Sequence, residues 1–92
     1  MNEFVLGEFY EAIGDDVRIG TSHICLYLAL VNEGNSETGE FFPVDRAKLM
    51  KNAKISRKTY HKCMQELREY GYIKYEPANS PFSRSRVLLK RL

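Results

Sequence analysis

Residues 45–73, with the sequence DRAKLMKNAKISRKTYHKCMQELREYGYI, carry the clearest structural pattern of this 92-residue chain. Apolar residues recur at helical spacing on both sides of residues 54–55, which predicts two short helices joined by a tight turn. Asp45 and Ser56 stand immediately before the two helices and are residue types that favour N-caps. Gly71 follows the second helix and marks its end. The pattern therefore predicts a helix–turn–helix unit.

The second helix of this unit is predicted to have one apolar and one basic face. Helical spacing places on the apolar face Tyr60, Cys63, Met64, Leu67 and Tyr70. The opposite side would expose Ser56, Arg57, Lys58, His61, Lys62, Gln65 and Glu69. Arg and Lys bind phosphates and guanine, and Gln pairs with adenine. The side chains from Ser56 to Gln65 on this side are therefore the candidate DNA-binding surface, and a merely solvated basic face is the alternative interpretation.

A β-hairpin is predicted after this helix. Residues 72–76 alternate apolar and polar side chains, as a half-buried strand does, and residues 86–92 form the second strand. Residues 77–85 between them contain two prolines, one asparagine and three serines, which predicts a turn-rich loop. The hairpin therefore follows directly on the helix–turn–helix unit.

Three residues of this hairpin are candidate DNA contacts. Ser83 can donate a hydrogen bond to a phosphate oxygen, and Arg84 and Arg86 can bind phosphate or enter a narrow minor groove. Ordinary solvated loop residues are the alternative interpretation. Phe82 is expected to fold back and pin the loop rather than to insert between bases.

Before position 45 the sequence predicts a central helix. Thr and Ser at positions 21–22 are good N-cap residues, and Gly34 suits the position just past a helix end. Residues 24–31 between them form an almost continuous apolar run. A helix that is apolar all round is normally buried all round, so this helix should form the centre of the core.

A polar loop and a short apolar segment lead from this helix to the helix–turn–helix unit. The polar loop is predicted at residues 35–40. Residues 41–44 are apolar, but Pro43 lacks the amide proton that a central strand needs. This segment is therefore predicted to be an edge strand or an extended lead-in.

Residues 1–20 are predicted to form a helix over positions 2–13, followed by a stop and turn at positions 14–16. The helix carries an apolar stripe made of Leu6, Phe9, Tyr10 and Ile13. Such a stripe packs either on its own domain or against another subunit. We favour a homodimer, because two-fold dimers are the usual way to lengthen the DNA sequence that a small domain reads.

The charges are divided unequally along the chain. Residues 1–44 hold one cation and eight anions, whereas residues 45–92 hold 13 of the 14 Lys and Arg residues and four anions. The two halves therefore carry about −7 and +9, which the total of +2 conceals. A basic half is typical of a small domain that binds a polyanion. The acidic half indicates solubility, self-association or a protein partner.

The order of elements from residue 41 onward resembles the winged helix-turn-helix regulators of bacteria. Leu49 and Ala53 stand where the first helix of the family packs on the second, and residues 55–56 stand at the turn and N-cap. Residues 67–73 match the end of the recognition helix and the start of the wing. The resemblance is strong over about half of the chain. It implies a mainly α fold with a small β-hairpin (α+β), namely a three-helix core plus wing, here with an extra N-terminal helix.

The resemblance also implies a function for each part. Residues 21–92 would form the winged-helix domain of a sequence-specific double-stranded DNA-binding protein, most simply a transcriptional regulator. Its recognition helix at 56–70 would enter the major groove, and its wing at 77–86 would lie on the backbone or in the minor groove. Residues 1–20 would be a dimerisation extension. Two alternatives stay open: an accessory DNA-binding protein for mobile-element replication or excision, and a protein-interaction module without DNA specificity.

The other residue types indicate neither an enzyme nor a cofactor. No carboxylate pair, nucleophile–base pair, phosphate loop or metal-ligand spacing stands out. His23 and Cys25 are two positions apart, and so are His61 and Cys63. Residues at this spacing do not share a helix face, so neither pair suggests a metal site. Cys25 and Cys63 fit free thiols of a reducing compartment. The sequence has no signal-peptide pattern and no apolar run of membrane length, so we expect a cytoplasmic protein. We also expect no small-molecule substrate, because no catalytic pattern stands out.

Overall fold

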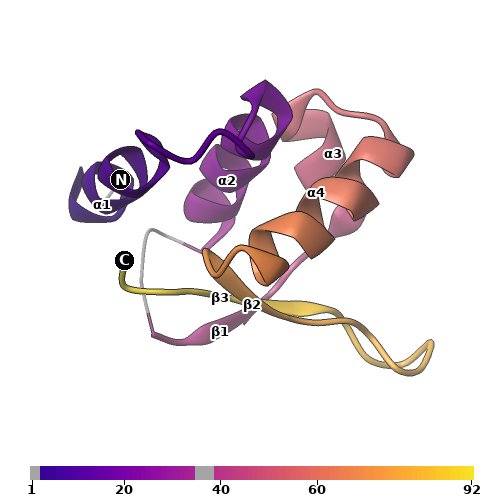
Figure 1. Cartoon of the computed structure of the whole chain (residues 1–92). Helices are drawn as coiled ribbons and strands as arrows, with labels where there is room; N and C mark the ends of the chain where they lie inside the picture. Colours follow the sequence, from indigo (N-terminus) through magenta and orange to yellow (C-terminus); the bar gives the residue numbers. More distant parts are fainter. Residues whose placement is uncertain (1–2, 35–38) are drawn as a thin grey trace.

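A computed structural model describes residues 3–34 and 39–92. In these ranges the chain is a small α+β domain with four helices and a three-stranded antiparallel sheet. The elements in order are α1 (Glu3–Ile13), α2 (Thr21–Glu33), β1 (Phe41–Pro43), α3 (Arg46–Ala53), α4 (Arg57–Glu69), β2 (Ile73–Glu76) and β3 (Arg86–Leu89). The helices lie together on one side of the sheet, and the β2–β3 hairpin extends beyond them (Figure 1). This arrangement is compatible with a winged helix.

Local capping chemistry sets the limits of α3 and α4, as predicted. The Asp45 carboxylate accepts a hydrogen bond from the Lys48 amide at 3.2 Å, and the Ser56 hydroxyl accepts one from the Thr59 amide at 3.2 Å. The tight turn between the helices is made by Lys54, which adopts a left-handed conformation with φ 61° and ψ 42°. After α4, Gly71 takes a φ of 87°, which glycine adopts without steric cost, and the chain turns into β2.

The predicted N-cap of α2 is wrong by one residue. The cap is Gly20, whose amide donates a hydrogen bond to Nδ1 of His23 at 3.0 Å. The imidazole thus does what a Glu or Gln side chain does three residues past a cap, and the hydroxyls at positions 21–22 are not needed for it. Gly34 ends the helix as predicted.

The prediction that α2 is buried on every side is also wrong. Leu26, Leu30 and Val31 are fully buried, but Cys25 and Leu28 are only half-buried. These two residues border an open groove of about 470 Å³ between α2 and the α3–α4 turn. The helix is apolar on that side too, yet none of the described elements covers it.

None of the helices in residues 3–34 and 39–92 combines the length and apolar character of a membrane span.

The three strands pair in the order β1-β3-β2, all antiparallel. The predicted hairpin is confirmed, and β1 occupies the edge position that Pro43 requires. The predicted second strand is too long, because β3 ends at Leu89 rather than at residue 92. Beyond β3 the chain turns towards α1, where the Leu92 amide donates to the Glu8 carboxylate at 2.7 Å. Of the predicted polar loop at 35–40, residues 35–38 lie outside the described residues.

The helix α1 packs on the core of its own chain. Phe9 is 1% exposed, and its ring stacks on that of Tyr27 with 3.7 Å between centroids and 6° between planes. Leu6 and Ile13 are half-buried against the same core, whereas Tyr10 is 59% exposed. The interpretation of this stripe as an interface therefore needs correction at Phe9, since its side chain is not accessible to a second subunit.

Candidate nucleic-acid interface

The basic face of α4 is fully formed by the helical geometry. Tyr60, Cys63, Met64 and Leu67 are buried beneath the helix. All seven residues predicted for the opposite face are exposed, including Ser56 and Glu69 at its two ends. The five residues between these ends are Arg57, Lys58, His61, Lys62 and Gln65. Because these positions are three and four residues apart, they form one continuous surface along the first turns of α4.

The two lysines on this surface are not held in ion pairs with the described residues. Within residues 3–34 and 39–92, the ion pairs involve Arg18, His23, Lys48, Arg86 and Arg91. Lys58 and Lys62 are in none of them. Their charges are therefore available to an external anion.

Ser56 has a structural role at the start of this face. Its hydroxyl accepts a hydrogen bond from the Thr59 amide and donates one to the Thr59 hydroxyl at 3.0 Å. Ser56 is exposed, so it lies beside the candidate surface. Its hydroxyl is nevertheless used mainly for the two hydrogen bonds that cap α4.

The basic surface continues from α4 onto α3. Arg46, Lys51 and Arg57 border a second open depression of about 460 Å³, whose apolar lining includes Met50 and Ile55. Two separate helices thus hold three cations around one concavity. Phosphate groups of a polyanion would fit against such a surface, since each cation can approach from a different direction.

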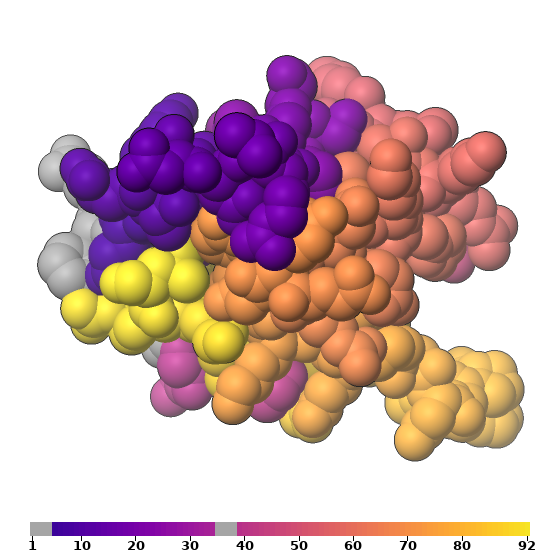
Figure 2. Space-filling view, viewed as in Figure 1, coloured from indigo at the N-terminus to yellow at the C-terminus, as the bar shows by residue number. Residues whose placement is uncertain are grey.

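The wing, residues 77–86, stands clear of the body (Figures 1 and 2). Its loop is held by its own polar groups rather than by contacts with the helices. The Ala78 amide donates to the Ser85 hydroxyl at 3.1 Å, and the Ser83 hydroxyl bonds to Asn79 Oδ1 at 3.3 Å. The predicted DNA contact Ser83 is thus engaged in shaping the loop.

The two predicted wing arginines lie in different environments. Arg84 is exposed and makes no ion pair in the described part of the chain. Arg86 instead pairs with the Glu76 carboxylate across the hairpin, and its guanidinium lies over the Phe41 ring at 4.9 Å. Arg84 therefore presents an uncompensated charge near the wing tip, whereas the charge of Arg86 is balanced within the sheet.

The prediction that Phe82 folds back is wrong. Its side chain is 98% exposed. The reason is the geometry of the tip, where the Ser83 amide donates to the Ser80 carbonyl at 3.3 Å and closes a tight turn. This turn lies beyond the sheet, so the ring has no apolar surface of its own domain within reach.

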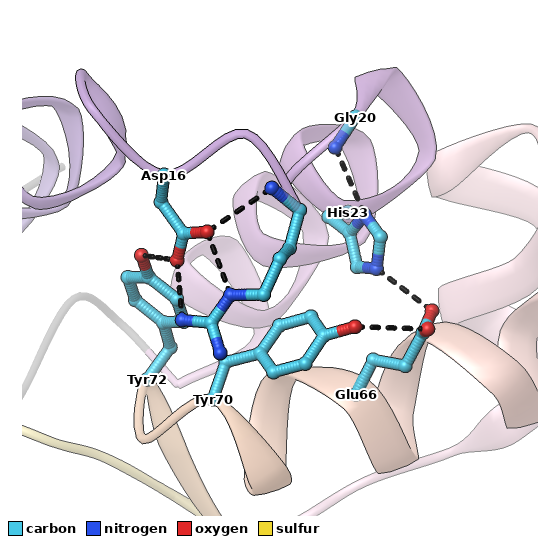
Figure 3. A network of polar contacts seen from close by, with 7 residues as sticks. Asp16, Gly20, His23, Glu66, Tyr70 and Tyr72 are labelled. Carbon is cyan, nitrogen blue, oxygen red and sulfur yellow. Dashed lines mark hydrogen bonds and ion pairs between the residues drawn. The ribbon is translucent and has the colours of Figure 1, made fainter.

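A partly buried hydrogen-bond network joins α4 to α2 (Figure 3). His23 Nε2 lies 3.0 Å from Oε1 of Glu66, and the Tyr70 hydroxyl donates to Oε2 of Glu66 at 3.1 Å. The hydrogen bond from His23, followed by that from Tyr70, lowers the pKa of the Glu66 carboxyl against the opposing effect of burial. The network helps to set the orientation of the exposed face of α4.

A second cluster joins the α1–α2 connection to the end of α4 (Figure 3). The Arg18 guanidinium donates to both oxygens of Asp16 at 2.8 Å and lies over the Tyr70 ring at 4.1 Å. The Tyr72 hydroxyl donates to Asp16 at 2.6 Å. The hydrogen bonds from Arg18 and then Tyr72 hold the pKa of the Asp16 carboxyl well below its ordinary value of 3.8.

We expect Asp16→Asn to lower the melting temperature near neutral pH. A carboxyl with a depressed folded-state pKa stabilises the fold above its ordinary pKa of 3.8, and this contribution is lost as the pH falls below that value. The difference from wild type should therefore shrink by about pH 3 in thermal denaturation. Asp15→Asn is the control, because Asp15 is exposed and makes no ion pair in the described residues. An equal loss in both variants would exclude the Asp16 cluster as the cause.

Three potential metal ligands lie close together between α2 and α4. Donor atoms of His23, Cys63 and Glu66 lie within 4.8 Å of one another. However, the Gly20 amide donates to Nδ1 of His23, so the proton of the neutral ring must lie on Nε2, the nitrogen that faces the other two groups. A metal-bound imidazole needs the opposite arrangement, with its distal nitrogen donating. Burial also raises the pKa of the Cys63 thiol, which disfavours a thiolate ligand. The donor set is therefore that of a hydrogen-bond network.

Comparisons of the chain with protein-family models, with curated proteins and with solved structures found no match. Function is accordingly inferred from the surface of the domain. Its main feature is a set of exposed cations on α4 and α3, with Arg84 on the projecting wing.

Proposed function

We propose that this protein binds double-stranded DNA in a sequence-specific manner and regulates transcription in the cytoplasm of a bacterial cell. The observation that carries the proposal is the exposed α4 face, where Lys58 and Lys62 form no ion pair with the described residues. A set of solvated cations on a single helix face is the electrostatic complement of a row of phosphates.

The shape of the surface supports the same function. An α-helix fits the major groove of B-DNA, which is about 12 Å wide. Arg57, Lys58 and Lys62 lie in the first turns of α4, whereas the end of the helix carries both Arg68 and Glu69. The N-terminal half of α4 would therefore enter the groove first, as in other helix-turn-helix proteins. Gln65 and His61 would then face base edges, and Arg84 would reach the backbone or the minor groove from the wing.

A homodimer completes the proposal. A single domain reads one short half-site, so a two-fold pair would lengthen the recognised sequence. The exposed side of α1 carries Tyr10 and Glu11 and belongs to the acidic half of the chain. Like charge repels this side from the phosphates, so it is suited to face a second subunit rather than the DNA.

We expect binding to duplex DNA to depend steeply on salt. Contact with four to six phosphates would give a slope of roughly −4 to −5 for log K against log salt concentration, per bound monomer. In vitro selection of duplexes at fixed salt supplies the ligand, and fluorescence anisotropy at several salt concentrations gives the slope. Affinity that does not change with salt, or selection that returns no preferred sequence, would overturn the proposal and leave a protein-interaction module as the function.

A further inference from the structure

We infer that Phe82 is a wedge that enters the minor groove, separates two stacked base pairs and bends the bound duplex. The inference rests on the proposed function and goes beyond it. It assigns a deformation of DNA to one side chain, rather than only an affinity.

The first observation is the exposure of the ring. Phe82 is 98% exposed, so the fold of its own domain gains nothing from its apolar surface. A single exposed apolar residue is common on protein surfaces and has no meaning by itself. Phe82 differs because it belongs to residues 77–86, and this wing projects from the body, where a partner can surround it (Figure 2).

The second observation is that the tip is organised before any partner binds. The Phe82 amide donates to the Ser80 hydroxyl at 3.3 Å, and the Ser83 amide donates to the Ser80 carbonyl at 3.3 Å. Pro81 precedes the ring and restricts the backbone at the tip further. A side chain that unstacks base pairs must resist being pushed aside, and a turn closed by hydrogen bonds on both sides of Phe82 provides that resistance.

The third observation is the charge beside the ring. Arg84 follows Phe82 by two residues, is exposed, and makes no ion pair among the described residues. An apolar side chain inserted at a base step, with an Arg held near the groove, is the arrangement that minor-groove wedges use. The minor groove is about 6 Å wide and admits a narrow loop more readily than a helix. With α4 in the adjacent major groove, the wing tip would reach this groove.

The experiment uses a duplex selected for the wild-type protein. End-to-end energy transfer between two dyes measures the bend, and 2-aminopurine placed at successive positions reports unstacking. We expect wild type to shorten the end-to-end distance and to raise 2-aminopurine fluorescence at one step. Phe82→Ala should abolish both signals and weaken binding by about tenfold or less, because the cost of deforming the DNA disappears together with the contact.

Two further variants separate a wedge from a simple contact. Phe82→Leu keeps an apolar wedge and should retain most of the bend. Arg84→Ala should weaken binding and reduce the salt slope by about one, while bound duplex stays bent. Because both positions are exposed, circular dichroism should show an unchanged fold for all variants.

The outcomes also separate the two proposals. If wild type binds no duplex, the proposed function fails and the wedge fails with it. If wild type binds a selected sequence but Phe82→Ala bends it equally, only the wedge is overturned, and the proposed function stands.

Discussion

Phe9→Ala is expected to lower the free energy of unfolding by about 3–5 kcal/mol, the usual cost of truncating a buried aromatic ring. The ring is 1% exposed, stacks on Tyr27 at 3.7 Å and meets Tyr72 edge-on at 5.6 Å. Removing it leaves a cavity between α1 and the rest of the core. Domains of this size have total stabilities of about 5–15 kcal/mol, so the variant would lie close to its unfolding threshold.

Val17 supplies the control for this prediction. It is an apolar residue in the connection after α1 and is 98% exposed, so Val17→Ala should change stability by no more than about 0.5 kcal/mol. Urea denaturation followed by circular dichroism, at one fixed protein concentration, measures both variants. If Phe9→Ala dissociated a dimer and left the unfolding midpoint unchanged, Phe9 would be an interface residue after all.

The ends of α3 and α4 could be predicted from sequence because their causes are local. The Asp45 and Ser56 caps act over three residues, and Gly71 is required by the backbone conformation at a single position. The same holds for the candidate surface on α4. Helical periodicity alone decides which side chains face outward once the apolar face is known.

The polar clusters behind α4 could not be predicted. The His23–Glu66 contact joins residues 43 positions apart, and the Tyr72–Asp16 contact spans 56 positions. No spacing rule reports such contacts, because they depend on how whole helices pack. Their signal in the sequence is at most a set of polar residues in otherwise apolar helices, which many exposed positions also show.

The sequence also does not show which surface covers an apolar stripe. Phe9 and Tyr10 are adjacent, and both belong to the stripe of α1, yet one is buried and the other exposed. Periodicity shows that a stripe must be covered, but it does not show whether its own chain or a second subunit covers it. The prediction for Phe82 is wrong for a related reason. Its loop is irregular and has no periodicity from which the orientation of a side chain could be predicted.

The largest expected effect on function belongs to the double variant Lys58→Ala/Lys62→Ala. If each lysine makes a charge-assisted contact of about 1–2 kcal/mol, affinity for the selected duplex should fall by about 30- to 700-fold. If both lysines contact phosphates, the salt slope should also become shallower by roughly two. Fluorescence anisotropy over a range of salt concentrations measures both quantities. Stability should not change, since both side chains are exposed.

The matched control is Lys74→Ala/Lys90→Ala. Both double variants reduce the net charge from +2 to 0, so they change the overall attraction to DNA equally. Lys74 belongs to β2 and Lys90 to the segment after β3, so neither lysine is part of α4. A local contact predicts a much smaller loss in this control, because only long-range attraction is reduced. Equal losses in the two double variants would mean that total charge, and not the α4 surface, determines binding.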